Sequence, residues 1–529
     1  MKRLLFVFFA LLSALCGRVS GQTTGSLDLS FNGTGEVVYN RDQWDLYNDV
    51  KVQPDGKIVA VGSSISPGYA TTVIEVTRYL PDGTFDPTFG TNGHYNYSAY
   101  TESNAYKCLI RADGKILIAG GTTNYAHYWM LLIQLNADGT PDQTFGNSGV
   151  SIYTMGPQEN YLYSLALTTD GKILAAGYSQ DASYNNIPVV LRYMATGDVD
   201  LSFGNNGVAT VPVTEIDNAY SAISVQSDGK ILAAGHISNG LNWFSLLITR
   251  FNTDGSLDAT YGSGGIVNLN LNNVDDEFFD MKLNENNEAF LSGFSVIQVD
   301  TNFNYHGLLM KFDVSGQVVN SFGTNGSVIT GDVPYTVGDA LILQGDGKIL
   351  MTGSTGDLQP ANNDWALWRF NADGSADNTF GTNGLTTTDF FGGSDEALGI
   401  ALYQDKIIVA GKIRNATDYL DFAVARYLND YSVTVPEIQG LSNCTVFPNP
   451  VQPGGSVKLE YNLARSGNVS LGLVNCTGTT VYSLPVGNQA EGKHSCKITV
   501  PQGIAAGVYC LKISGPEFTS QTLKLLVTE

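Results

Sequence analysis

The sequence predicts an all-β protein, a seven-bladed β-propeller followed by a small Ig-like β-sandwich. Two motifs predict the propeller, because each recurs seven times at a spacing near 58 residues between Gly25 and Asp430. Such a period indicates a repeat architecture. Composition agrees, since 59 of 529 residues are glycine, aromatics make up 11% and charged residues only 15%, which is typical of short strands and tight turns. A change of pattern after Asp430 predicts the second domain.

Residues 1–21 have the pattern of a signal peptide. Lys2 and Arg3 precede the apolar run Leu4–Cys16, and small residues follow it. The run is too short to cross a bilayer comfortably, and no later stretch approaches the length of a transmembrane segment. The net charge of −22 disfavours nucleic-acid binding, which needs clustered lysine and arginine. We therefore expect an exported protein without a transmembrane segment.

The two landmark motifs define each repeat. The first is Asp-Gly-Lys-Ile followed by an apolar run, and Asp-Gly between apolar runs is a strong hairpin signal. Its lysine position is occupied by Lys57, Lys115, Lys172, Lys230, Glu288, Lys348 and Lys406. The second is D-x-x-F-G-x-x-G, centred on Phe31, Phe89, Phe145, Phe203, Tyr261, Phe322 and Phe380.

The fourth repeat illustrates the expected strands. Alternating apolar residues predict strands at 219–226, 230–235 and 244–251, and a fourth at 266–271 that we expect to pair with the next repeat. A four-stranded sheet with two apolar faces must be covered by neighbours on both sides. Seven such sheets arranged radially form a propeller.

The two ends of the repeat region complement each other. The last repeat stops after Tyr427 without the second landmark, whereas Ser26–Phe31 precedes the first repeat without a partner. We therefore predict that the N-terminal segment closes the ring. The predicted domains are the propeller at 22–431, a linker at 432–442 and the second domain at 443–529.

The repeat D-G-K-I-L-x-A-G, followed by A-R-Y-N-x-D-G-S-x-D-x-x-F-G-x-N-G, resembles the delta-60 repeat family of exported bacterial proteins. The resemblance covers roughly 400 residues. The fifth copy departs most, with Asn286-Asn287-Glu288 at the first landmark and Val314-Ser315-Gly316 at the second turn. The resemblance implies a β-propeller and no defined activity.

Six short strands are predicted in the last domain, at 457–463, 469–474, 480–484, 493–500, 507–513 and 521–527. This segment resembles the C-terminal sorting domain of the type IX secretion system. The matching motif residues are Phe447, Pro448, Asn449, Pro450, Gly478, Gly507, Val508 and Tyr509. The usual aspartate before the middle glycine is replaced by Asn475-Cys476-Thr477. The resemblance implies type IX secretion machinery as a partner, and passage through the periplasm to the outer cell surface or the medium.

Cysteine is concentrated in the same domain. Four of the six cysteines, Cys444, Cys476, Cys496 and Cys510, fall in it and permit three pairings if all are bonded. Cys496 alternates with Ile498 and Val500, so a buried free thiol is the alternative.

A variable loop in every repeat carries an aromatic residue. These candidate ligand-binding residues are Tyr69, Tyr125, Tyr184, Trp243, Tyr305, Trp365 and Tyr419. Equivalent loops of a propeller lie on one side of the ring, and exposed aromatics beside amides suit sugars. The alternative is that each aromatic packs on its own blade.

Two recurring polar patterns have a structural and a functional interpretation. The N-x-D-G-x-x-D turns, such as Asn252-Asp254-Asp258, offer oxygens to calcium, but they lack the ligand set of a calcium loop and equally suit tight turns. A basic residue four positions before each second turn either forms an anion-binding ring or pairs with a nearby carboxylate. These basic residues are Arg78, Arg192, Arg250, Lys311, Arg369 and Arg426, with Gln134 as the exception.

Enzyme signatures are sparse. The five histidines lack metal-ligand spacing and no nucleophile elbow is present, although paired carboxylates from distant blades remain compatible with the sequence. We expect a monomeric, non-enzymatic binding or adhesion module without a cofactor or metal, whose ligand is a glycan or a protein. The alternatives are a polysaccharide-acting enzyme and a purely structural surface protein.

Overall fold

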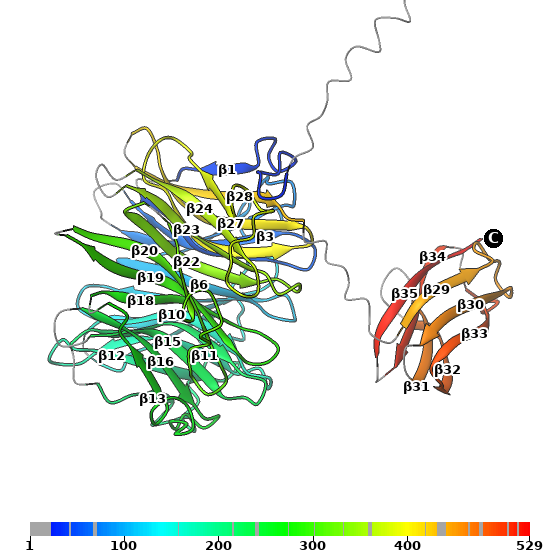
Figure 1. Cartoon of the computed structure of the whole chain (residues 1–529). Coiled ribbons are helices and arrows are strands. Elements are labelled where there is room, and N and C mark those ends of the chain that lie inside the picture. The colour runs from blue at the N-terminus through cyan, green and yellow to red at the C-terminus, as the bar shows by residue number, and fades with distance from the viewer. Residues whose placement is uncertain are drawn as a thin grey trace, which may run out of the picture. The chain divides into compact units, whose positions relative to one another are not determined.

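The computed structural model divides the chain into two compact units, Met1–Tyr431 and Ser432–Glu529 (Figure 1). The predicted signal peptide and residues 432–440 of the predicted linker lie outside the described residues. All regular elements in the described part are strands. The structure describes residues 23–430 and 441–528, except 42–43, 67–70, 157, 214–215, 239–242, 273, 301, 332, 358–361, 418, 464–465, 475–479, 505–506 and 516–517.

The described strands of the first unit form seven antiparallel groups of four, in which each strand pairs with the next. The first strands are β2 (Trp44–Val52), β6 (Glu102–Ile110), β10 (Asn160–Leu167), β14 (Asn218–Val225), β18 (Asp276–Leu283), β22 (Tyr335–Leu343) and β26 (Glu396–Tyr403). The second strands are β3 (Ile58–Ile65), β7 (Ile116–Thr123), β11 (Ile173–Gln180), β15 (Ile231–Ser238), β19 (Ala289–Val299), β23 (Ile349–Asp357) and β27 (Lys406–Arg414).

The third and fourth strands complete each group. The third strands are β4 (Thr72–Tyr79), β8 (Tyr128–Leu135), β12 (Asn186–Tyr193), β16 (Phe244–Phe251), β20 (Asn302–Phe312), β24 (Asn362–Phe370) and β28 (Leu420–Leu428). The fourth strands are β5 (His94–Tyr97), β9 (Val150–Tyr153), β13 (Val208–Thr210), β17 (Ile266–Leu269), β21 (Ser327–Ile329), β25 (Leu385–Thr388) and, for the last group, β1 (Glu36–Tyr39).

The turns follow from the landmark residues. Between β14 and β15, Gln226 and Lys230 form a backbone hydrogen bond of 2.8 Å, and Gly229 adopts a φ of +85° that disfavours other residues. After β16, the chain folds back at Tyr261-Gly262 so that β17 pairs with β16. The expectation that residues 266–271 pair with the next repeat was therefore wrong, because this turn returns the chain to the strand it has just left.

The second landmark joins neighbouring repeats. Phe203 is fully buried, and the guanidinium of Arg192 lies 4.6 Å from its ring centre. Arg192 donates through Nε to Asp200 at 2.8 Å and through NH1 to the Thr253 carbonyl of the next repeat at 2.5 Å. The prediction that the recurrent basic residue pairs with a nearby carboxylate is confirmed, and the same side chain also ties one repeat to the next.

The N-terminal segment completes the last group, as predicted. β1 pairs with β28 over Glu36–Tyr39, and the Gly25 and Asp28 amides donate to the carbonyls of Leu428 and Arg426. Arg426 donates through Nε to Asp28 at 2.9 Å and lies over the ring of Phe31. This is the contact that Arg192, Asp200 and Phe203 make within one repeat, here formed between the two ends of the unit. β2 then packs against β26 and β27.

The second unit consists of two antiparallel sheets that share one core. One sheet contains β29 (Leu441–Phe447), β30 (Ser456–Leu463) and β33 (Gly492–Thr499). The other contains β32 (Thr480–Gln489), β31 (Gly467–Val474), β34 (Gly507–Gly515) and β35 (Phe518–Val527). The six expected strands are present. The structure also contains β29, which the sequence did not predict because apolar and polar residues alternate less clearly in it than in its partner β30.

The sorting-motif residues occupy defined places in this unit. Phe447 ends β29 with its side chain 45% exposed, and the Asn449 side chain accepts a hydrogen bond of 2.9 Å from the Leu526 amide. Gly507 begins β34, and Tyr509 lies in the core. Gly478 falls outside the described residues.

Candidate functional site

Each first strand of the propeller contains a β-bulge at the same position. The bulge leaves one residue without a partner on the second strand and redirects its side chain. The bulged residues are Asn48, Tyr106, Tyr163, Ser221, Phe279, Asp339 and Leu398. All seven line one cavity of about 470 Å³. The seven first strands therefore surround a central channel, and each repeat presents one bulged side chain to it.

One side of this cavity is aromatic. The rings of Tyr106 and Tyr163 meet edge to face with centres 4.8 Å apart, and Tyr178 from β11 lies 5.9 Å from Tyr163. The Tyr178 hydroxyl donates to Glu159 at 2.7 Å. Burial raises the pKa of all three hydroxyls, so each remains protonated and able to donate. This wall offers flat apolar faces with polar edges.

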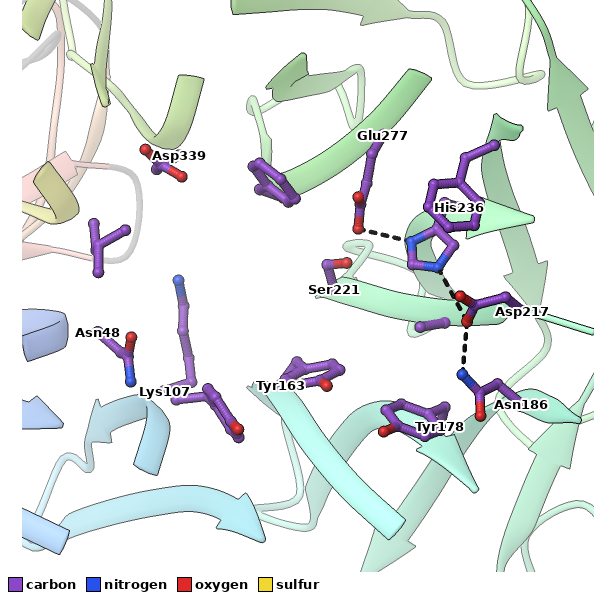
Figure 2. Close-up of a pocket in the computed structure, with 15 residues that line it drawn as sticks. Asn48, Lys107, Tyr163, Tyr178, Asn186, Asp217, Ser221, His236, Glu277 and Asp339 are labelled. Carbon is purple, nitrogen blue, oxygen red and sulfur yellow. Dashed lines mark hydrogen bonds and ion pairs between the residues drawn. The ribbon is translucent and has the colours of Figure 1, made fainter. Parts of the chain in front are cut away.

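A second side is formed around His236 on β15. Its Nδ1 lies 2.7 Å from Glu277 of the next repeat, and its Nε2 lies 3.9 Å from Asp217 (Figure 2). Burial lowers the pKa of His236, but Glu277 and Asp217 raise it by more, to about 9. Asn186 also donates to Asp217, at 2.6 Å. His236 is therefore a cation at neutral pH, held in place by two carboxylates.

Asp339 is the one acid among the bulged residues. Burial, and then the charge of Glu396, raise the pKa of its carboxyl well above the ordinary value. Within the part of the chain that the structure describes, this carboxyl has no hydrogen-bond partner. The Asp339 carboxyl therefore holds a proton more readily than an ordinary aspartate does, and it faces the cavity.

Lys107, next to the bulge of β6, also lines the cavity. Its Nζ lies 3.9 Å from Asp49 and 3.7 Å from Asp280, which belongs to the fifth repeat. Burial lowers the pKa of Lys107, but Asp280 and Asp49 raise it by more. Lys107 also lines a second cavity of about 500 Å³ in the channel. We call the five charged residues that line this second cavity, Asp49, Lys51, Lys107, Asp280 and Lys282, the charged waist.

The loop aromatics that the structure describes lie outside this cavity. Of the six that lie in the described residues, none lines the cavity between the first strands. Tyr125 and Tyr184 are exposed at loop tips, and both have a φ of +67°. Tyr419 is 37% exposed. The seventh residue, Tyr69, lies outside the described residues.

The remaining three loop aromatics pack on their own surroundings. Trp243 contacts Phe303 with ring centres 5.5 Å apart, and Tyr305 lies 5.8 Å from Tyr335. Trp365 was expected among the ligand-binding residues, but its side chain is only 1% exposed. It lies within β24 and donates its indole N–H to the Lys412 carbonyl at 3.1 Å. A ligand has no access to it, so this expectation is corrected.

The acidic turns have internal partners. The Asp254 carboxylate accepts hydrogen bonds from the Ser256 amide and hydroxyl, and Asp258 accepts from Thr260 and Arg250. Among the described residues, no group of three or more histidine, cysteine, aspartate or glutamate side chains is arranged to hold a metal ion.

The sequence predicted ligand-binding residues in the loops and did not predict the residues that line the cavity. A signal for them exists, because each bulged residue stands nine positions before the first-landmark lysine position, or eight in the last repeat. Residue type gives no hint, since the seven positions hold six different amino acids.

Five segments of the chain match the family described as "domain of unknown function (DUF5122) beta-propeller": residues 53–89, 111–145, 168–203, 226–261 and 344–380. Residues 445–528 match the secretion system C-terminal sorting domain. No curated protein matches the sequence. Among the described residues, no helix has the length and apolar character needed to cross a membrane.

Three of the solved structures that match this chain share little sequence with it. The polysaccharide lyase Uly1 is 13% identical with a TM-score of 0.43, covering 74% of this chain and 92% of its own. An ulvan lyase of family PL25 is 11% identical with a TM-score of 0.41, covering 75% and 96%. The Trypanosoma rangeli sialidase is 10% identical with a TM-score of 0.34, covering 92% and 85%.

The two family matches settle the organisation of the chain and its destination. Repeats of the DUF5122 kind run through the first unit, and a sorting domain that engages the type IX secretion machinery occupies the C-terminus. The chain is therefore an exported protein, delivered to the cell surface or the medium, with DUF5122 beta-propeller repeats and a type IX sorting domain.

Proposed function

We propose that the propeller binds a saccharide in the cavity that the seven bulged residues line. The observation that carries this proposal is the bulge itself. It recurs at one position in all seven first strands and aims seven side chains into one cavity. Bulges beside a ligand site commonly redirect a side chain in this way.

The chemistry of the wall favours a saccharide. Tyr106 and Tyr163 provide apolar ring surface against which a sugar ring packs. His236, Asp217 and Asp339 provide donors and acceptors for hydroxyl groups. A cavity of about 470 Å³ lies within the usual range for small-ligand sites, roughly 300–1,000 Å³. A rigid propeller that fixes such a site, carried on an exported chain, fits a binding module at the cell surface.

A substitution that fills the cavity tests the site. Ser221→Trp places a large side chain at a bulged position, and Ser183→Trp places the same side chain on the exposed loop beside Tyr184. The secreted protein is first screened against a saccharide array, and the best hit is then titrated against both variants. We expect Ser221→Trp to abolish binding and Ser183→Trp to retain it. Equal binding by both variants, or no hit on the array, contradicts the proposal.

A second candidate is a polysaccharide-acting enzyme, favoured by the raised pKa of the Asp339 carboxyl in the same cavity. Carboxyl groups with a raised pKa serve as general acids in glycoside cleavage. Asp339→Asn preserves size and hydrogen bonding but removes the proton donor. If the protein is an enzyme, this variant loses turnover of a bound polysaccharide and retains binding. If no reducing ends or unsaturated products form with the wild type, the binding module remains the better description.

A further inference from the structure

The charged waist contains two self-contained ion pairs. Asp49 and Lys51 on β2 occupy the same repeat positions as Asp280 and Lys282 on β18. Lys51 donates to both Asp49 oxygens at 2.7 Å and to the Val50 carbonyl at 3.0 Å. Lys282 donates to both Asp280 oxygens, at 2.7 and 2.6 Å, and to the Met281 carbonyl at 3.3 Å. Each ammonium has therefore used its three N–H groups.

Both aspartates have a further task that fixes them in place. Asp49 accepts a hydrogen bond of 3.0 Å from the Cys108 amide of the next repeat, and Asp280 accepts one of 3.2 Å from the Leu341 amide. Their side chains are 2% and 6% exposed. The two pairs are therefore rigid parts of the propeller and do not depend on a third lysine.

Lys107 is the exception in the waist. Its distances of 3.9 and 3.7 Å to Asp49 and Asp280 exceed that of a hydrogen bond. Its ammonium meets the two carboxylates only at these ion-pair distances, and its side chain is 18% exposed. With three lysines and two aspartates, the waist carries one positive charge in excess, in a chain whose net charge is −22. Lys107 is the one lysine of the five residues that lines both cavities.

We propose that the Lys107 ammonium binds an oxyanion, that is, a carboxylate, sulfate or phosphate group, at the waist. Because Lys107 meets both aspartates only at ion-pair distance, an oxyanion can accept closer hydrogen bonds from its N–H groups and offset the excess positive charge of the waist. Burial lowers the pKa of Lys282, and the charges of Lys107 and Lys51 lower it further against the opposing effect of Asp280. One more negative charge relieves that repulsion. The site does not depend on the saccharide proposal, because a free inorganic anion satisfies the same geometry.

Two sources of the oxyanion are distinguished by the choice of probe. Sulfate and phosphate represent a free anion. Galacturonate represents an acidic group on a sugar in the first cavity, and galactose is the uncharged control. Each is titrated calorimetrically into the full-length secreted protein at constant ionic strength set with chloride. We expect at least one of the anionic probes to bind, and galactose to bind at least ten times more weakly than the anionic probe that binds most tightly.

Lys107→Met is the decisive variant, and Lys172→Met is its matched control. Each variant removes one lysine, and in each case the carboxylate that it faced keeps another cation. Asp49 still pairs with Lys51 in the first variant. Asp200 still pairs with Arg192 in the second. We expect Lys107→Met to weaken oxyanion binding at least tenfold, and Lys172→Met to leave it unchanged. Equal anion binding by both variants overturns the proposal.

A measurement on the wild type keeps the test valid if Lys107→Met is unstable. An anion that binds the folded waist raises the melting temperature as its concentration rises. We expect sulfate, phosphate or galacturonate to raise it above the value in chloride of matched ionic strength. No anion-specific shift, or binding of galactose as tight as that of the best anionic probe, overturns the proposal even if saccharide binding itself is found.

Discussion

Replacing Phe31 by alanine tests whether the N-terminal segment closes the propeller ring. Phe31 is fully buried among residues from β3, β27 and β28, and the guanidinium of Arg426 lies 4.8 Å from its ring centre. Removing a buried phenylalanine side chain costs about 3–5 kcal/mol of unfolding free energy. Loss of the cation–π contact adds about 0.5–2 kcal/mol. We therefore expect Phe31→Ala to lower the free energy of unfolding by about 4 kcal/mol or more.

Phe203→Ala is the matched control, because Phe203 has the same burial and the same arginine contact within the interior of the chain. Denaturant unfolding followed by tryptophan fluorescence is selective, since all five tryptophans lie in the first unit. The two variants should be destabilised to within about 1 kcal/mol of each other. A near-zero effect of Phe31→Ala beside a large effect of Phe203→Ala refutes closure by this segment.

Three further predictions concern titration, packing and export. The folded-state pKa of His236, about 9, exceeds its ordinary 6.5. The contribution of its charge to the stability of the fold is therefore fully present below pH 6.5 and is lost as the pH rises through 9. Relative to His236→Asn, the wild type should lose about 3 kcal/mol of unfolding free energy over that range, and parallel pH profiles contradict this. Trp365→Ala should lower the free energy of unfolding by about 3–5 kcal/mol, measured by thermal or denaturant unfolding, and leave saccharide binding intact. Tyr184→Ala should change that free energy by no more than about 0.5 kcal/mol. A larger loss in Tyr184→Ala than in Trp365→Ala contradicts this prediction. Deleting residues 443–529 should leave the propeller folded but retained in the periplasm, as measured by cell fractionation and immunoblotting, and normal surface delivery of the truncated chain contradicts it.

The repeat architecture could be predicted from sequence because its determinants are local and periodic. The Asp-Gly turn at Asp228-Gly229 and the buried landmark Phe203 require particular residue types, so they recur visibly. Ring closure followed from the same periodicity, since the motif missing after Tyr427 stands at Phe31.

The site could not be predicted in the same way. A bulge is a property of strand register, and the residue it redirects is unconstrained by packing, so Asn48, Tyr163 and Asp339 share no chemical type. The charged waist brings Lys107 from the second repeat to Asp280 from the fifth, across the channel, and no local pattern encodes that pairing. Trp365 shows the opposite limit. Trp365 was assigned to the variable loop and expected to be exposed. In the structure, β24 already begins at Asn362, so Trp365 lies within this strand and its side chain is buried.

The most direct test compares two tyrosines of the third repeat in one binding experiment. Tyr163 is a bulged residue in the cavity, and Tyr184 is 62% exposed at the loop tip. Both are replaced by alanine, and the affinity of each variant for the saccharide found by array screening is measured by calorimetry alongside its melting temperature. With both variants folded, we expect Tyr163→Ala to weaken binding at least tenfold and Tyr184→Ala to leave it unchanged. Loss of binding in Tyr184→Ala alone would place the site on the loops and contradict the cavity as the functional site.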